Sequence, residues 1–146
     1  MKKVIATSIL LVGIFLVGHA QIPNWQWANE IKGQKEDYAR SIACDSKGNV
    51  VVIGDYLSDS LKIGSVTLHN MHPTGGLINQ YNLSDIFVSK YDSLGNIIWS
   101  KSYGSDSADV AYSVTIDNAD NIIVVGKFNG DTLHIGTHQL MKPSNQ

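Results

Sequence analysis

The chain has 146 residues, of which 43% are hydrophobic and 16% are charged, and its formal net charge is −2. A chain of this length and composition is expected to form one folded globular domain. The near-neutral charge argues against the broad basic surface that nucleic-acid binding requires, and a single cysteine excludes an internal disulfide framework and a multi-cysteine zinc site.

Residues 1–20 have the layout of a secretory signal peptide. Two lysines precede an almost unbroken apolar run at 9–17, and small residues then predict cleavage between Ala20 and Gln21. Because the apolar run is too short to span a bilayer comfortably, we expect an exported chain without a membrane span; an uncleaved N-terminal anchor is the alternative. Cleavage leaves residues 21–146 as the repeat segment, with a net charge of −4.

The repeat segment matches itself without a gap at a shift of 72 positions. Internal repeats of this kind are typical of solenoids, propellers and other arrays. Conservative pairs, such as Ile42 with Val114, lie between the identical ones. The identical pairs include Trp27/Trp99, Asp37/Asp109, Ala39/Ala111, Asp45/Asp117, Asn49/Asn121, Gly54/Gly126 and Leu68/Leu140.

The repeat unit is predicted to consist of β-strands. Residues 49–56 and 121–128 are runs of β-branched side chains between turn residues, which is typical of strands buried on both faces. No segment after residue 20 shows a sustained apolar period of 3.6 residues, so the helix content should be near zero. Strands are expected near 25–31, 38–45, 49–56, 60–63, 66–69, 84–91, 96–103, 110–117, 121–128 and 132–135.

Three predicted turns follow the pattern Asp-x-x-Gly-Asn. The leading carboxylate can accept N–H bonds inside the turn, and the fourth position needs a positive φ, which glycine adopts freely and aspartate tolerates better than most residues. Lys47, Leu94 and Ala119 occupy positions where a calcium loop needs oxygen ligands, so we predict structural hairpin turns. The turns are Asp45–Asn49 with Gly48, Asp92–Asn96 with Gly95, and Asp117–Asn121 with Asp120 in the place of glycine.

The segment from Asp85 to Phe128 resembles the SBBP β-propeller repeat, and the segment from Trp27 to Tyr56 resembles it in part. Asp120 and an inserted loop at 71–83 depart from the pattern of that family. The matching positions are Asp85, Phe87-Val-Ser-Lys-Tyr91, Gly95, Trp99, Gly104, Asp109-Val-Ala111, Asp117, Asn121 and Gly126-Lys-Phe128.

This resemblance implies an all-β fold of about two four-stranded propeller blades in a secreted or surface-displayed bacterial protein. A propeller needs roughly four to eight blades to close, and an open pair of blades leaves apolar faces exposed. We therefore expect the chain to be the N-terminal part of a longer polypeptide that supplies further blades in cis. Self-association of two-blade units is the alternative.

No catalytic, cofactor or metal site is predicted. The sequence has no Gly-x-Ser-x-Gly elbow, phosphate loop, dinucleotide fingerprint or histidine set with metal-ligand spacing. Aspartates such as Asp45 and Asp117 recur once per repeat, which favours structural roles over a catalytic pair. Cys44 aligns with Ile116 and is expected to be a buried thiol.

Aromatic and histidine side chains supply the candidates for ligand contact. Trp27 and Trp99 are equivalent in the repeat, which favours packing between strands. Trp25 has no aromatic partner one repeat away, and His72 and Tyr81 lie in the loop that is not repeated. We expect ligand contacts at these three residues, because function is grafted where a repeat deviates.

The sequence as a whole predicts a non-enzymatic, exported propeller scaffold that binds a protein or glycan. One alternative is a part of a propeller enzyme, such as a glycan-active hydrolase or lyase, with its catalytic residues elsewhere. The other is a structural spacer in a surface protein.

Overall fold

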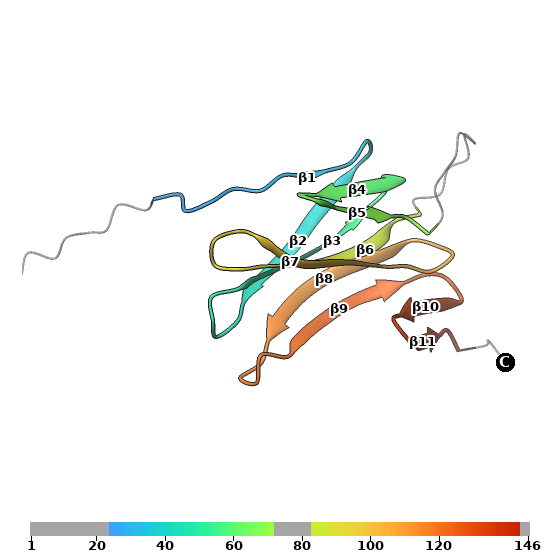
Figure 1. The fold of residues 1–146 in the computed structure, drawn as a ribbon. Helices are drawn as coiled ribbons and strands as arrows, with labels where there is room; N and C mark the ends of the chain where they lie inside the picture. The colour runs from blue at the N-terminus through green and yellow to red at the C-terminus, as the bar shows by residue number, and fades with distance from the viewer. Residues whose placement is uncertain (1–23, 72–82, 144–146) are drawn as a thin grey trace, which may run out of the picture.

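The computed structural model describes residues 24–71 and 83–143, and every regular element there is a β-strand (Figure 1). None of these residues belongs to a helix that is long and apolar enough to cross a membrane. The strands are β1 (Ile31–Lys32), β2 (Asp37–Cys44), β3 (Val50–Tyr56), β4 (Ser60–Ile63), β5 (Val66–His69), β6 (Asp85–Tyr91), β7 (Ile97–Tyr103), β8 (Asp109–Ile116), β9 (Ile122–Phe128), β10 (Thr132–Ile135) and β11 (His138–Met141).

Two antiparallel sheets form the body of the molecule. The first sheet has the order β2-β3-β6-β7, and the second sheet consists of β8 and β9 among the described residues. The second sheet repeats the β2–β3 pair down to the same register shift, which falls between Ala39 and Ser41 in one and between Ala111 and Ser113 in the other. The all-β prediction is confirmed, and the two sheets have the arrangement of neighbouring propeller blades that do not close a ring.

The core between the two sheets is built from alternate side chains of their strands. Val51 and Ile53 of β3 are fully buried, and Val88 of β6 is 6% exposed. They pack against Ala111 and Val114 of β8, where small and medium side chains allow the sheets to approach closely.

A short hairpin accompanies each β2–β3-type pair. β4 pairs with β5 and β10 pairs with β11, and each hairpin turns through a glycine with positive φ, Gly64 (56°) and Gly136 (60°). In the first unit, β1 pairs with β4. The repeat equivalent of β1 lies at the end of β7, and there the His134 N–H donates a hydrogen bond of 3.4 Å to the Gly104 carbonyl, which links β10 to β7. In the first unit, Leu61 and Ile63 of the hairpin are fully buried.

One strand prediction was wrong, and one strand was missed. The predicted strand 25–31 is a strand only at Ile31–Lys32. This segment is the repeat equivalent of β7, which pairs with β6. Among the described residues, no strand equivalent to β6 lies beside 25–31, so most of the segment has no pairing partner. β11 was not predicted, although a shift of 72 positions from β5 places a strand at His138–Met141.

The predicted burial of two features was also wrong. β3 is buried on both faces, whereas its counterpart β9 is exposed along most of its length: Val125 is 58% exposed and its equivalent Ile53 is 0% exposed. Cys44 is exposed, while Ile116 packs against the core. Ile53 packs against β8, and Ile116 packs against the core between the two sheets. No further sheet of the described residues covers Val125 or Cys44 in the same way, so both remain exposed.

Candidate functional site

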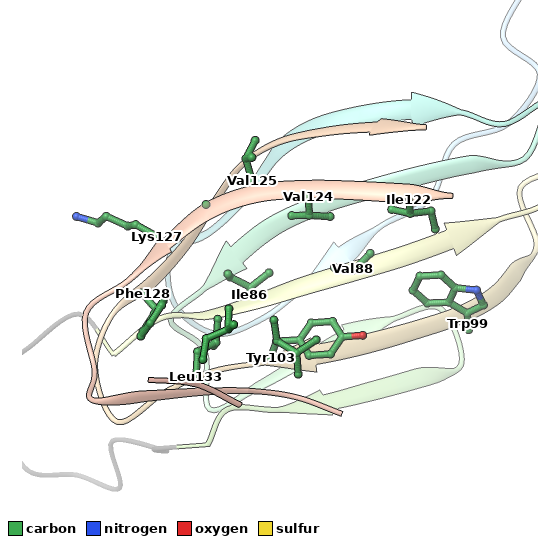
Figure 2. Close-up of a pocket in the computed structure, with 13 residues that line it drawn as sticks. Ile86, Val88, Trp99, Tyr103, Ile122, Val124, Val125, Lys127, Phe128 and Leu133 are labelled. Atoms are coloured by element: carbon green, nitrogen blue, oxygen red, sulfur yellow. The ribbon is translucent and has the colours of Figure 1, made fainter. Parts of the chain in front are cut away.

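An apolar groove opens between the two sheets. Its volume is about 590 Å³. Figure 2 shows Trp99 and Tyr103 on one wall, and Ile122 and Val124 pointing toward them from β9. The groove is lined by Ile86, Val88, Trp99, Tyr103, Ile122, Val124, Val125, Gly126, Lys127, Phe128, Leu133, Ile135 and Leu140.

The groove exists because β9 has one free edge among the described residues. β3 pairs with β2 on one side and with β6 on the other, whereas β9 pairs with β8 alone. An exposed strand edge presents unpaired N–H and C=O groups that can pair with another strand. An apolar trough beside such an edge suits an extended polypeptide, whose alternate side chains enter the trough.

The three Asp turns have the predicted geometry. Gly48, Gly95 and Asp120 have φ values of 76°, 86° and 60°. In the first turn, Asp45 Oδ1 accepts the N–H groups of Lys47 and Asn49 at 3.0 and 2.9 Å. The matching bonds in the other turns reach Asp92 from Leu94 and Asn96, and Asp117 from Ala119 and Asn121.

Sequence reasoning missed the role of the asparagine that closes each turn. Its side-chain amide donates to the other oxygen of the leading carboxylate, over 2.8 Å from Asn49 to Asp45 and over 2.9 Å in the other two turns. The spacing Asp-x-x-x-Asn was the available signal, since residues four apart face each other across such a turn.

Asp120 replaces glycine in the third turn for a reason that only the tertiary structure reveals. Its carboxylate accepts the N–H of Ser46 at 2.9 Å and the Ser46 hydroxyl at 2.7 Å, so it joins the turn of the second sheet to that of the first. These bonds favour the charged form and lower the pKa of Asp120.

Asp45 differs from the other turn aspartates because it carries an ion pair. Lys90 Nζ of β6 lies 2.7 Å from Asp45 Oδ2, and the two side chains are 16% and 2% exposed. The hydrogen bond from Lys90, followed by those from Asn49, holds the pKa of Asp45 well below its usual range despite the opposing effect of burial. The pair ties the turn to the middle of the first sheet.

We expect Asp45→Asn to reduce stability at neutral pH and to flatten its acid dependence. A carboxylate whose folded pKa lies below its unfolded value of about 3.9 contributes its full stability above that value and loses it as the pH falls. The wild-type melting temperature should therefore drop between about pH 4 and pH 2 more steeply than that of the variant. Thermal unfolding followed by circular dichroism at several pH values tests this.

Asp117→Asn is the matched control for Asp45→Asn. Asp117 makes the same turn bonds and is exposed, without a lysine partner in the described part of the chain. Its substitution should have a smaller effect on both stability and pH dependence. Equal effects of the two substitutions would contradict a special role for Lys90.

Asp37 begins β2 and Asp109 begins β8, and each carboxylate accepts a hydrogen bond from one serine hydroxyl. Ser58 Oγ donates to Asp37 over 2.7 Å, and Ser105 Oγ donates to Asp109 over 2.8 Å. The two serines come from opposite sides, because Ser58 is equivalent to Gly130 in the repeat. The equivalent carboxylates of the two units therefore accept a hydroxyl from different positions of the repeat. Burial raises the pKa of Asp109.

The glycines facing these serines have no room for a side chain. A Cβ on Gly33, the repeat equivalent of Ser105, would fall on Ser58 Oγ. A Cβ on Gly130 would lie 2.5 Å from Ser105 Oγ. Each site thus holds one serine and one glycine, in exchanged positions.

A second, polar pocket of about 540 Å³ lies where β2 and β3 meet the ends of β8 and β9. Arg40 Nε donates to Asp55 over 2.7 Å, and the guanidinium lies 4.5 Å from the centre of the Tyr38 ring. The hydrogen bond to Asp55 raises the pKa of Arg40, and the hydrogen bond to Glu36 raises the pKa of Tyr38. Arg40 and Asp55, two of the charged residues of this pocket, are thus paired with each other.

Of the three predicted contact residues, the structure describes Trp25 alone. Trp25 is 91% exposed on the segment before β1, and His72 and Tyr81 lie outside the described residues. Trp27 stacks on the Tyr91 ring with centroids 5.7 Å apart, and Trp99 packs against the inter-sheet core while lining the groove. The described residues contain no cluster of three or more histidine, cysteine, aspartate or glutamate side chains that could hold a metal ion.

A comparison with known proteins finds a relative among large repeat proteins. The chain is 28% identical over 125 residues to an uncharacterized WD repeat-containing protein of Acanthamoeba polyphaga mimivirus, a match that covers 80% of this chain. The chain spans 9% of the length of that relative. No family model and no solved structure matches the chain.

Proposed function

We propose that this chain is an exported β-propeller-type repeat scaffold, of the SBBP kind, that binds a polypeptide and performs no catalysis. The open edge of β9 with its apolar groove carries the proposal, because a strand edge beside an apolar trough suits an extended polypeptide better than a sugar. The signal-like residues 1–20 support export to the cell surface or the medium. The likeness to a WD repeat-containing protein supports the repeat scaffold.

Glycan binding is the competing function, and one experiment separates the two. The mature chain 21–146, biotinylated at the exposed Cys44, is applied in parallel to an array of extended peptides and to a glycan array. We expect saturable binding to peptides and none to glycans. Binding to glycans alone, or to neither array, would contradict the proposed function.

Export is tested separately by expressing the full chain with its own N-terminus in a bacterial host. The mass of the protein recovered outside the cytoplasm should correspond to a chain that begins at Gln21. Retention of residues 1–20 on a cytoplasmic product would contradict export.

A further inference from the structure

The edge of β3 that corresponds to the free edge of β9 shows what kind of strand fits there. β6 pairs antiparallel with β3 in a continuous register from Val50↔Tyr91 to Tyr56↔Asp85. A shift of 72 positions carries β3 onto β9, residue by residue. The first unit of the molecule therefore contains, in place, the strand that the second unit lacks in its described residues.

The first specific contact of β6 is an aromatic ring laid against a glycine. Phe87 is 1% exposed, and a Cβ on Gly54 would lie 2.6 Å from its ring. The equivalent Gly126 borders the groove, and the nearest atoms to a Cβ there belong to the backbone of Val110 and Ala111 rather than to a ring. A phenylalanine of an added strand would find the same flat surface.

The second contact is the stacking of Tyr91 on Trp27. Trp99 is the repeat equivalent of Trp27 and stands in the groove, as Figure 2 shows. Within residues 24–71 and 83–143, no aromatic ring stacks on Trp99 as Tyr91 does on Trp27. A tyrosine opposite Ile122, the counterpart of Val50, would reach it.

The third contact is the ion pair between Lys90 and Asp45. Asp117 has the same turn geometry as Asp45, with the carboxylate held by the same three hydrogen bonds. It is exposed and forms no ion pair in the part of the chain that the structure describes. A lysine one residue before the tyrosine of an added strand would pair with it.

We propose that β9 and the groove bind one extended polypeptide segment of the β6 type, with the spacing Phe-x-x-Lys-Tyr, in antiparallel register. The phenylalanine packs on Gly126, the tyrosine stacks on Trp99, and the lysine pairs with Asp117. A second copy of this chain does not offer such a segment in its folded form, because its own β6 lies between β3 and β7. The inference deepens the proposed function and rests on the chain being a polypeptide-binding scaffold.

The test uses a fluorescent peptide of residues 84–92, which contains β6, and the mature chain 21–146. Fluorescence anisotropy should show saturable binding, and the indole N–H resonance of Trp99 should shift in a ¹⁵N correlation spectrum. The Phe87→Ala and Tyr91→Ala peptides should each bind about tenfold more weakly, since buried aromatic anchors dominate such interfaces. A scrambled peptide is the negative control.

Two lysine substitutions on β9 locate the binding face. Val124→Lys places a charge in the groove and should abolish binding, while Ile123→Lys on the opposite face of the same strand should leave it unchanged. Val124 and Ile123 are 38% and 48% exposed, so both variants should fold. Equal loss with both variants would overturn the assignment to the groove.

The ion pair is tested by combining Asp117→Asn in the chain with Lys90→Met in the peptide. Each change alone should weaken binding about fivefold, and the two together no more than either alone, because both remove one charge-assisted bond. Asp92→Asn in an equivalent turn away from the groove is the matched control and should have no effect. Losses that multiply in the double variant would overturn the pairing of Lys90 with Asp117.

The outcomes separate this inference from the proposed function. Absence of saturable binding of the 84–92 peptide, with other peptides still bound on the array, overturns the strand assignment and leaves the scaffold function standing. A stable dimer in size-exclusion chromatography with light scattering, with the Trp99 resonance insensitive to the peptide, shows a second copy in the groove and also overturns it.

Discussion

Ile53→Ala is expected to lower the free energy of unfolding by about 2–5 kcal/mol, as deletion of a fully buried aliphatic side chain does. Ile53 is 0% exposed in the core between the two sheets. β3, which carries Ile53, is hydrogen-bonded to β2 on one side and to β6 on the other, so the cavity left by the substitution cannot collapse easily. Urea unfolding followed by circular dichroism measures the loss.

The repeat supplies the control at the equivalent position. Val125→Ala removes a side chain that is 58% exposed on β9, and it should change stability by about 0.5 kcal/mol or less. A loss at Val125 as large as that at Ile53 would mean that another molecule covers this face of β9 in solution. The pair of variants thus measures how much of the burial in each repeat comes from a neighbouring sheet.

Gly130→Ser should destabilise the protein by about 1–3 kcal/mol, because it introduces a second side chain where Ser105 already fills the space. Ser105→Gly should cost a similar amount, since it takes a hydrogen bond from the buried Asp109. The double variant recreates the arrangement of Gly33 and Ser58 in the first unit. Its stability should therefore exceed that of the Gly130→Ser variant, although Asp106 Oδ1, which also lies close to a Cβ at position 130, must still move.

The measurement is a double-mutant cycle in urea, with the coupling energy as the result. Residues that share one space and one hydrogen-bond partner show coupling of about 0.5–3 kcal/mol. Strictly additive losses from the two substitutions would contradict the exchange of serine and glycine between the two sites.

Local chemistry made much of the fold predictable from the sequence. Runs of β-branched side chains and Asp-x-x-Gly-Asn turns act over a few residues, so nine of the strands and all three turns lie where they were expected. The prediction of a strand at 25–31 was wrong because a strand requires a pairing partner, and the composition of a segment does not reveal whether it has one. The predicted burial of Cys44 and β9 was wrong for a similar reason, since burial depends on whether a neighbouring sheet covers the side chain.

The candidate site was only partly visible in the sequence. Trp99 and Gly126 were identified as repeat positions, but not as walls of one groove, because they come from β7 and β9 in different sheets. The pairing of Lys90 with Asp45 was missed, since the two residues are joined by strand order rather than by spacing. Trp25, which is 91% exposed, lies on the segment before β1 and remains a prediction.

The sequence by itself determined the repeat, the β character of each unit and the chemistry of its turns, because these depend on interactions between residues close along the chain. Only the tertiary structure decided which strand edges are paired and which faces are covered, because those depend on contacts between distant segments. The two repeat units therefore differ most in burial where one has a neighbouring sheet and the other does not, at Ile53 and Val125.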